Sequence, residues 1–331
     1  MITQFERSKL EFEKLFSHQM SDSEMRDFLI SMRLDEHTSV DAIAAAATVM
    51  REYSISLPYD KSLQPKLIDI VGTGGDKIGS FNISSTTSLL ASAAGLYVAK
   101  HGNRSITSKS GSADLFEVLN VRLDLSVESS AKLLEECGFT FMFAQNHHPA
   151  MKFIMPIRKS IDEKTIFNVL GPLTNPAKAE KFLLGVFDKS FVPKIAQALE
   201  LMKIKSALVV SSREKMDEIS ISDITYASKV IDSKATGMFE INPADYNLKM
   251  PDLSAIAGGD AKENAQILHN IFTNRATDAQ RDIVLINAAH AFVVDGIARD
   301  VQDGLEIARE TINSGKAVEK LKQIQKVSAQ L

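Results

Sequence analysis

The chain contains no tryptophan and a single cysteine, Cys137, among its 331 residues. One cysteine excludes an intramolecular disulfide and fits a reducing compartment, so we expect a cytoplasmic protein with a buried, structural thiol at this position. The first sixteen residues are charged throughout and lack the apolar core of a secretory signal. The longest nearly apolar run, 42–50, is too short to span a bilayer, which argues against a membrane protein.

An excess of positive charge is also absent, since Lys and Arg number 38 against 42 acidic residues, a net charge of −4. This balance argues against a non-specific nucleic-acid binder, although a local basic loop can still hold phosphate. Hydrophobic residues make up 44% and charged residues 24%, as in an ordinary soluble globular protein. The length predicts one large domain and a smaller one.

The stretch 67–114 carries the strongest indication of a binding site in the sequence. Leu67 to Val71 is an apolar run between Pro65 and Gly72, which predicts a buried strand. Glycines at 72, 74, 75 and 79 follow and remove the Cβ atoms that would keep a ligand from the backbone. The segment NISSTTS then supplies helix-capping residue types. This order presents unpaired N–H groups and a positive helix end to an anion.

A second loop of the same kind follows the apolar run 96–99. It starts with Lys100-His101-Gly102-Asn103-Arg104 and ends at Asp114. Two such loops after successive strands predict a ligand that carries more than one phosphate. No Gly-Lys-Ser/Thr follows at P-loop spacing, and Lys77 stands where a dinucleotide site needs its third glycine. The alternative from the residues alone is a glycine-rich turn before a capped helix.

The rest of the chain predicts helices first and then an α/β body. Residues 1–57 have helical periodicity, with a capping box from Ser21 to Glu24, and 58–66 is the best linker candidate. After residue 114, strands (139–143, 182–187, 207–210) alternate with helices (129–137, 191–203, 261–274, 278–296, 301–313), which predicts a mainly parallel sheet. The segment 147–177 interrupts this alternation. We expect it to join the helical part, the alternative being a long irregular loop.

At several motifs the chain resembles the anthranilate phosphoribosyltransferase family. GTGGD, NISS, KHGNR and SGSAD resemble the family's phosphoribosyl pyrophosphate loops, and HHPAMK (147–152), FNVLGPLTNPA (167–177) and MDEIS (216–220) match as well. The resemblance covers nearly the whole chain. It implies transfer of the phosphoribosyl group of phosphoribosyl pyrophosphate to the amine of anthranilate, a step of tryptophan biosynthesis, with Mg²⁺ as cofactor and usually as a homodimer.

The resemblance also implies a fold and its domains. The fold is α/β, a mainly parallel sheet flanked by helices with a smaller all-helical domain, of the nucleoside phosphorylase/phosphoribosyltransferase type. Residues 1–65, joined by part of 147–177, would form the helical domain. Residues 66–146 and 178–331 would form the α/β domain that binds phosphoribosyl pyrophosphate, with the active site in the cleft.

The site residues implied by the resemblance belong to the same motifs. Those that would bind the substrates are Gly72, Gly75, Asp76, Ser80, Asn82, Ile83, Ser84, Ser85, Lys100, His101, Gly102, Asn103, Arg104, Ser108, Ser112 and Arg158. Asn103 and Arg158 would contact anthranilate, since an Arg fork matches a carboxylate in two parallel hydrogen bonds. Ser84, Asp217 and Glu218 would bind magnesium. No covalent catalysis is expected; the protein positions substrates and neutralises charge, with Lys100 and His101 as contributors.

Several of these residues have an alternative interpretation. Asp217-Glu218 lies in the charge run REKMDE, which is typical of a solvated loop, and His101 also fits a structural histidine. His147 and His148 have no further Cys or His at ligand spacing, so we expect no zinc. After Arg158 the family usually shows Leu-Gly-x-Arg-Thr, whereas this chain has Asp and Lys at the Gly and Arg positions, 162 and 164.

Two other functions compete with the transferase. A pyrimidine nucleoside phosphorylase-like enzyme would carry a Lys-His-Ser-Thr-Gly-Gly type of loop, whereas here 69–72, Asp-Ile-Val-Gly, precedes Thr73-Gly74-Gly75. A non-catalytic nucleic-acid-binding relative would have basic surfaces and eroded metal ligands, but this chain is acidic overall and keeps Asp217-Glu218. We therefore expect small-molecule substrates, with neither nucleic acid nor membrane as partner.

Overall fold

The computed structural model describes residues 2–76, 78–105 and 109–331. Its centre is a sheet with the strand order β3-β2-β1-β4-β5-β6-β7, in which β8 also pairs with β6. All pairings among the first five strands are parallel, so the predicted mainly parallel sheet is confirmed. The strands are β1 (Leu67–Gly72), β2 (Tyr97–Gly102), β3 (Phe139–Phe143), β4 (Lys181–Gly185), β5 (Ser206–Ser212), β6 (Thr225–Ile231), β7 (Lys234–Ala235) and β8 (Phe239–Ile241).

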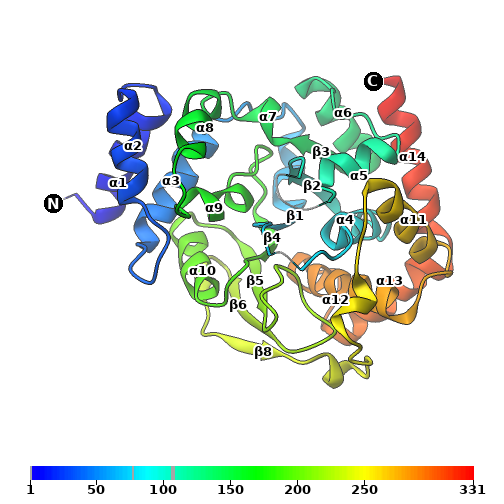
Figure 1. The fold of residues 1–331 in the computed structure, drawn as a ribbon. Coiled ribbons are helices and arrows are strands. Elements are labelled where there is room, and N and C mark those ends of the chain that lie inside the picture. The colour runs from blue at the N-terminus through cyan, green and yellow to red at the C-terminus, as the bar shows by residue number, and fades with distance from the viewer. Residues whose placement is uncertain (1, 77, 106–108) are drawn as a thin grey trace.

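Helices cover both faces of the sheet, and the two faces have separate cores (Figure 1). On β1, Ile68 and Ile70 belong to one core and Leu67 and Val71 to the other, as the two-residue period of a strand requires. Asp69 therefore lies on the second face, fully buried. The first core is built by α4 (Ile83–Ala93), α5 (Ser112–Val118), α6 (Val127–Cys137), α11 (Ala261–Phe272), α12 (Asp278–Asp295), α13 (Val301–Asn313) and α14 (Lys316–Gln330).

The second face carries α10 (Phe191–Leu201) and the N-terminal helices α1 (Gln4–Phe16), α2 (Asp22–Ser31) and α3 (Val40–Glu52), which lie at one end of the molecule (Figure 1). The predicted capping box is present: Ser21 accepts from the Glu24 N–H, and the Glu24 side chain accepts from the Ser21 N–H. The linker candidate 58–66 contains a 3₁₀ turn, η1 (Lys61–Lys66). Among the described residues, no helix is both long and apolar enough to cross a membrane.

The segment 147–177 contains helices that pack on the N-terminal helices, so the long-irregular-loop alternative is wrong. It forms α8 (Met151–Lys159), α9 (Phe167–Leu170) and η2 (Gly171–Leu173), preceded by α7 (Ala144–His147). α8 packs on α2 and α9 on α3. The backbone of Arg33 pairs with Thr165, and the Leu34 N–H donates to the Lys164 carbonyl at 2.8 Å. These contacts fasten the segment to the α2–α3 connection.

Three parts of the fold differ from the expectation or go beyond it. The chain after β5 turns back, so that β6 is antiparallel to β5 and forms antiparallel pairs with β7 and β8. Residues from Ser112 onward form α5, where a loop to Asp114 was expected. α14 completes the first core although its sequence was matched only by resemblance. The remaining short turns are η3 (Pro243–Tyr246) and η4 (Leu253–Ile256).

Candidate active site

The glycine loop meets the loop after β5 at the carboxyl ends of the parallel strands. Gly74 and Gly75 have φ of 68° and 74°, a left-handed conformation that glycine adopts at little cost. The Gly74 N–H donates to Asp217 Oδ2 at 2.6 Å. A Cβ on Gly72 would overlap the Asp217 carboxylate, and a Cβ on Gly185 would overlap the Asp217 backbone. Two paired glycines on β1 and β4 therefore let the acidic loop close onto the end of the sheet.

Asp217 and Glu218 are held inward, so the solvated-loop alternative is wrong. Asp217 is 8% exposed, and Glu218 Oε1 accepts from the Ser84 N–H at 3.1 Å. Burial, followed by the nearby Asp76 carboxylate, raises the pKa of Asp217 to about 7. Burial, followed by Asp217, raises the pKa of Glu218 well above its usual range. The pair is thus a desolvated acidic site that lacks a full complement of positive charge.

This site fits a hard divalent cation. Two crowded carboxylates and the Ser84 hydroxyl are oxygen ligands, and a cation between them would relieve their mutual repulsion. Mg²⁺ is usually bound by one or two carboxylates plus waters and substrate phosphates, rather than by a cage made of protein alone. In the described part of the chain, no group of three or more His, Cys, Asp or Glu side chains is placed to hold a metal ion.

Lys100 brings a buried ammonium to the same place. Its Nζ donates to the Ile70 carbonyl at 2.6 Å and to Ser84 Oγ at 3.4 Å. Burial lowers the pKa of Lys100, while Asp69, Glu218 and Asp217 oppose that change. Lys100 therefore provides a cation beside the glycine loop and faces the acidic pair across Ser84.

Asp69 and Asn175 form a buried network below Lys100 that sequence reasoning did not identify. Asn175 Nδ2 donates to Asp69 Oδ2 at 2.7 Å and to the Ala99 carbonyl at 2.8 Å. Asp69 Oδ1 accepts from the His101 N–H at 3.3 Å. Burial raises the pKa of Asp69 to about 7, although Lys100 and the Asn175 hydrogen bond oppose this rise. The network joins the LTNP segment to β1 and β2 and holds the backbone of His101.

A strap formed by residues 256–259 holds the glycine loop from its other side. Ser80 forms an antiparallel bridge with Ala257, and the Gly258 N–H donates to the Gly79 carbonyl at 2.8 Å. Asn82 starts α4 without a side-chain capping bond. Its Oδ1 accepts instead from Ser110 Oγ at 3.1 Å and from Asn264 Nδ2 at 2.8 Å. The capping role expected of this residue type is therefore wrong for Asn82, whose side chain links the start of α4 to Ser110 and to α11.

His101 is brought against His148, for which the sequence suggested no role. The two rings meet edge to face with centroids 5.1 Å apart. His101 Nδ1 lies 3.2 Å from the Gly171 carbonyl oxygen, and its Nε2 has no hydrogen-bond partner among the described residues. Burial lowers the pKa of His101 well below its usual range and that of His148 to about 4. Both rings are therefore neutral near pH 7, and the unpartnered Nε2 of His101 is buried.

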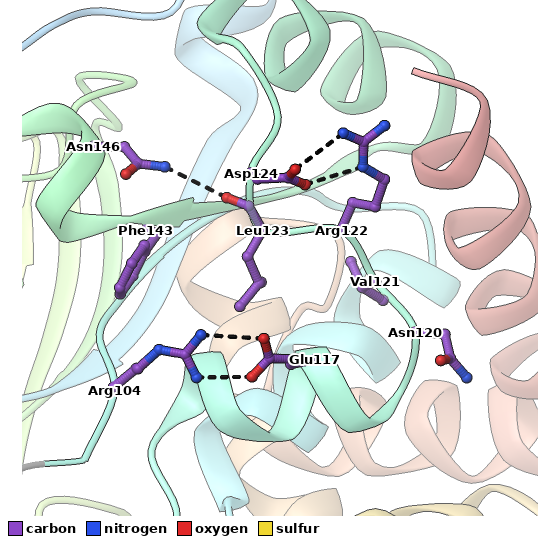
Figure 2. A pocket seen from close by; sticks show the side chains of 9 residues that line it. All are labelled: Arg104, Glu117, Asn120, Val121, Arg122, Leu123, Asp124, Phe143 and Asn146. Atoms are coloured by element: carbon purple, nitrogen blue, oxygen red, sulfur yellow. Dashed lines mark hydrogen bonds and ion pairs between the residues drawn. The ribbon is translucent and has the colours of Figure 1, made fainter.

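Arg104 is engaged by α5 rather than by the acidic loop. Its Nη1 donates to Asp114 Oδ1 at 3.0 Å and to Glu117 Oε2 at 2.8 Å, and its Nη2 donates to Glu117 Oε1 at 3.2 Å. Figure 2 shows the Arg104–Glu117 pair in the wall of an open pocket of about 610 Å³, which also contains the ion pair between Arg122 and Asp124. The guanidinium of Arg104 is thus directed to α5 and to this pocket.

The remaining predicted site residues differ in how far they are buried. A Cβ on Gly102 would meet Phe141 and Ser112, so the end of β2 lies directly against the start of α5. Asn103 is exposed and accepts from the Arg104 N–H at 2.8 Å. The side chains of Ile83 and Ser85 are buried, whereas Gly75 is exposed and Gly72, Asp76, Ser80, Ser84 and Ser112 are half-buried. Ser108 lies outside the described residues.

Arg158 ends α8 as a half-buried cation. Its guanidinium lies 5.8 Å from the centroid of the Phe167 ring, and its Nη1 is 3.9 Å from Met155 Sδ. Burial lowers the pKa of Arg158, and no described carboxylate lies within ion-pair distance of it. The two departures beside it point elsewhere: Asp162 is exposed, and Lys164 Nζ lies 3.7 Å from the centroid of the Phe187 ring.

Comparisons with known proteins agree with this geometry. The family described as glycosyl transferase family, a/b domain, matches residues 64–318. Anthranilate phosphoribosyltransferase of Persephonella marina is 41% identical over 96% of this chain and 92% of that protein. The enzyme of Polynucleobacter asymbioticus is 42% identical over 93% of this chain and 89% of that protein.

Solved structures of the same enzyme share the fold over almost the full length. The structure from Thermus thermophilus has a TM-score of 0.90 and 34% identity, covering 99% of this chain and 97% of that one. The structure from Saccharomyces cerevisiae, in complex with PRPP and Mg, has a TM-score of 0.86 and 28% identity, covering 98% and 92%. The α/β fold with a smaller helical domain is therefore confirmed.

Proposed function

This chain belongs to the anthranilate phosphoribosyltransferase family, and from that premise we propose that it joins anthranilate to phosphoribosyl pyrophosphate. The products are N-(5-phosphoribosyl)-anthranilate and pyrophosphate: the anthranilate nitrogen forms a bond to the sugar carbon, the bond from that carbon to pyrophosphate breaks, and the nitrogen loses a proton. The observation that carries the proposal is the meeting of the glycine loop, Lys100 and the Asp217–Glu218 pair at one end of the sheet.

The protein's part in this reaction is electrostatic and geometric. Positive charge grows on the ribose ring while pyrophosphate leaves as an anion, as in glycosyl transfer. The glycine loop from Gly72 to Ser80, the start of α4 and Lys100 supply N–H and ammonium donors for the leaving group. Ser84, Asp217 and Glu218 would hold Mg²⁺, which supplies positive charge to the pyrophosphate oxygens. Gly102, Asn103, Ser108 and Ser112 complete the site from the later loops.

A second set of residues, different from those around the glycine loop, would position anthranilate. Among the described residues no carboxylate lies within ion-pair distance of Arg158, so a substrate carboxylate can take its planar fork. Asn103 and the neutral edges of His101 and His148 offer polar atoms without adding positive charge next to the amine. This arrangement aims the weakly basic amine at the sugar carbon.

The domains and the assembly follow from the same proposal. The helical domain comprises 1–65 with part of 147–177, and the α/β domain comprises 66–146 and 178–331; the contacts of α8 with α2 and of α9 with α3 support this division. The protein acts in the cytoplasm as a homodimer formed through the helical domain. The buried, unpaired Cys137 fits a reducing compartment.

Loss of anthranilate fluorescence in the presence of phosphoribosyl pyrophosphate and Mg²⁺ tests the reaction directly. The wild-type protein should consume anthranilate only when all three are present. Replacing both Asp217 and Glu218 by Ala removes two anionic ligands, so turnover should collapse at limiting Mg²⁺ while the circular dichroism spectrum is retained. Phosphorolysis of uridine or thymidine without anthranilate turnover would instead favour the nucleoside phosphorylase alternative.

A further inference from the structure

A buried asparagine of α12, Asn287, holds the loop that carries the acidic pair. Its Oδ1 accepts from the Ile219 N–H at 3.0 Å, and its Nδ2 donates to the Ile219 carbonyl at 2.9 Å and to the Ile283 carbonyl at 2.8 Å. Asn287 and Ile219 are both 0% exposed. The amide thus pairs with both backbone groups of the residue directly after Glu218, in the manner of a neighbouring strand.

The orientation of this amide is determined by its partners. Exchanging its oxygen and nitrogen would point an NH₂ group at the Ile219 N–H and an oxygen at two carbonyls. With the observed orientation, both Nδ2 hydrogens and the oxygen are used, and no polar atom of the amide is left unsatisfied in the core. Because all hydrogen-bonding atoms of the amide are satisfied, Asn287 fixes the position of Ile219 relative to α12.

The two carboxylates of the loop accept from the Gly74 and Ser84 N–H groups, and further hydrogen bonds on either side of Asn287's contact come from nearby chain. Before the pair, Met216 exchanges hydrogen bonds with Ser212, at 3.0 Å each. After it, Ser220 Oγ donates to Glu214 Oε1 at 2.8 Å. These bonds shape the loop within itself. Asn287 bonds the backbone of the loop from the body of the protein, because α12 packs on α4, β4 and β5.

We infer that Asn287 is a positioning residue for magnesium: it aims Asp217 and Glu218 through Ile219 without touching substrate or metal. The inference rests on the proposed function of that pair. Losing the amide would leave the Ile219 N–H and carbonyl buried without partners, and the loop would move to satisfy them. Adjacent Cα atoms are about 3.8 Å apart, so a shift of Ile219 is passed on to Glu218 almost undiminished.

The test compares Asn287→Ala with the control His290→Ala. His290 is a buried polar residue of the same helix whose Nδ1 lies 2.8 Å from the Ile286 carbonyl of its own helix. Outer partners of metal ligands typically affect metal affinity or activity by about 10- to 100-fold. Asn287→Ala should therefore raise the half-saturating Mg²⁺ concentration by roughly 10- to 100-fold, with the KM for anthranilate unchanged at saturating Mg²⁺. His290→Ala should lower thermal stability and leave the Mg²⁺ requirement at the wild-type value.

A binding measurement without turnover provides the second readout. Calorimetric titration of phosphoribosyl pyrophosphate, with and without Mg²⁺ and without anthranilate, should show that the Mg²⁺-dependent gain in affinity is lost in Asn287→Ala and kept in His290→Ala. If Asn287→Ala does not fold, Asn287→Ser serves, since a serine hydroxyl can bond the Ile283 carbonyl of its own helix but does not reach Ile219. A folded variant with an unchanged Mg²⁺ requirement overturns the inference alone. A wild-type protein without Mg²⁺-dependent anthranilate consumption overturns the proposed function.

Discussion

Arg158 is a desolvated cation whose surroundings fit an anionic ligand. A guanidinium that has lost water without gaining a carboxylate is destabilised unless an anion joins it, and burial already lowers the pKa of Arg158. The Phe167 ring beneath it gives the planar fork a fixed orientation. The carboxylate is the only strongly interacting group of anthranilate, so a desolvated guanidinium of fixed orientation is suited to bind this substrate.

Arg158→Ala should lower kcat/KM for anthranilate by roughly 10- to 150-fold, since charge-assisted hydrogen bonds contribute about 1.5–3 kcal/mol. Arg158→Lys should restore only part of the loss, because the charge returns and the planar fork does not. Steady-state kinetics with each substrate varied in turn measure both effects. A raised KM for phosphoribosyl pyrophosphate with normal anthranilate kinetics would show that Arg158 serves the other substrate.

Burial of His290 should account for part of the pH dependence of the free energy of unfolding. Burial lowers its pKa from 6.5 to about 4 in the folded protein. The unfolded chain therefore binds this proton first as the pH falls, and stability is lost between about pH 6.5 and pH 4. From pH 7.5 to pH 5, wild type should lose about 2 kcal/mol more than His290→Ala. Urea unfolding of both proteins at the two pH values measures this difference; equal losses would mean that His290 is not buried as a neutral ring.

For single residues, the sequence predicted which residues come together at the site better than it predicted their burial and hydrogen-bond partners. The motifs place Asp217-Glu218, Lys100 and the glycines on segments that do meet, although Lys100 lies in β2 and not in the loop after it. Whether a charge run is solvated depends on tertiary contacts, here on Gly72 and Gly185, which lie more than a hundred residues apart. The buried partners Asn175, Asn264 and Asn287 carry no local signal, because their hydrogen bonds go to distant backbone and side chains.

At the scale of elements, strongly periodic segments were predicted well. α10 to α13 and β1 to β3 begin within two residues of the predicted positions, since a buried face imposes its period on the sequence. The β6–β8 region was not predicted: β7 and β8 have only two and three residues, and the three strands pair only with each other and with β5. Loops that bridge elements, such as the strap at 256–259, depend on both partners and have no period to detect.

The strap makes a prediction about substrate binding. Asn264→Ala removes a hydrogen bond to Asn82 and the contacts that hold the Gly259 backbone. Losing about 1–2 kcal/mol of positioning at the glycine loop should raise the KM for phosphoribosyl pyrophosphate by roughly 5- to 30-fold and leave that for anthranilate nearly unchanged. Asn270→Ala is the matched control, because Asn270 lies on the same helix and, within the described part of the chain, its side chain bonds only to Gln266. Equal effects of the two variants would assign the change to α11 as a whole.

At the scale of the whole molecule, apolar exposure is uneven. Among the described residues, eleven large apolar side chains are exposed. Five of them lie before α1, on α1, directly after α3 or on α8: Ile2, Leu10, Tyr53, Ile55 and Phe153. That part makes up about a quarter of the chain. Figure 1 shows α1 and α2 at one end of the molecule and α14 at the other. Concentrated apolar exposure marks an interaction surface.

The last prediction follows from this distribution and concerns the homodimer. Leu10 is 49% exposed and Ile55 44% exposed, so replacing both by Glu puts charge on the helical surface without emptying a core. If the helical domain forms the dimer, sedimentation equilibrium should give twice the chain mass for wild type and the single chain mass for Leu10→Glu/Ile55→Glu, because a buried unpaired charge opposes association. The control is Ile231→Glu/Met238→Glu, which changes two side chains of similar exposure in the β6–β8 region and should remain dimeric. Dissociation of the control instead would move the interface to the β6–β8 edge, where unpaired strands also favour association.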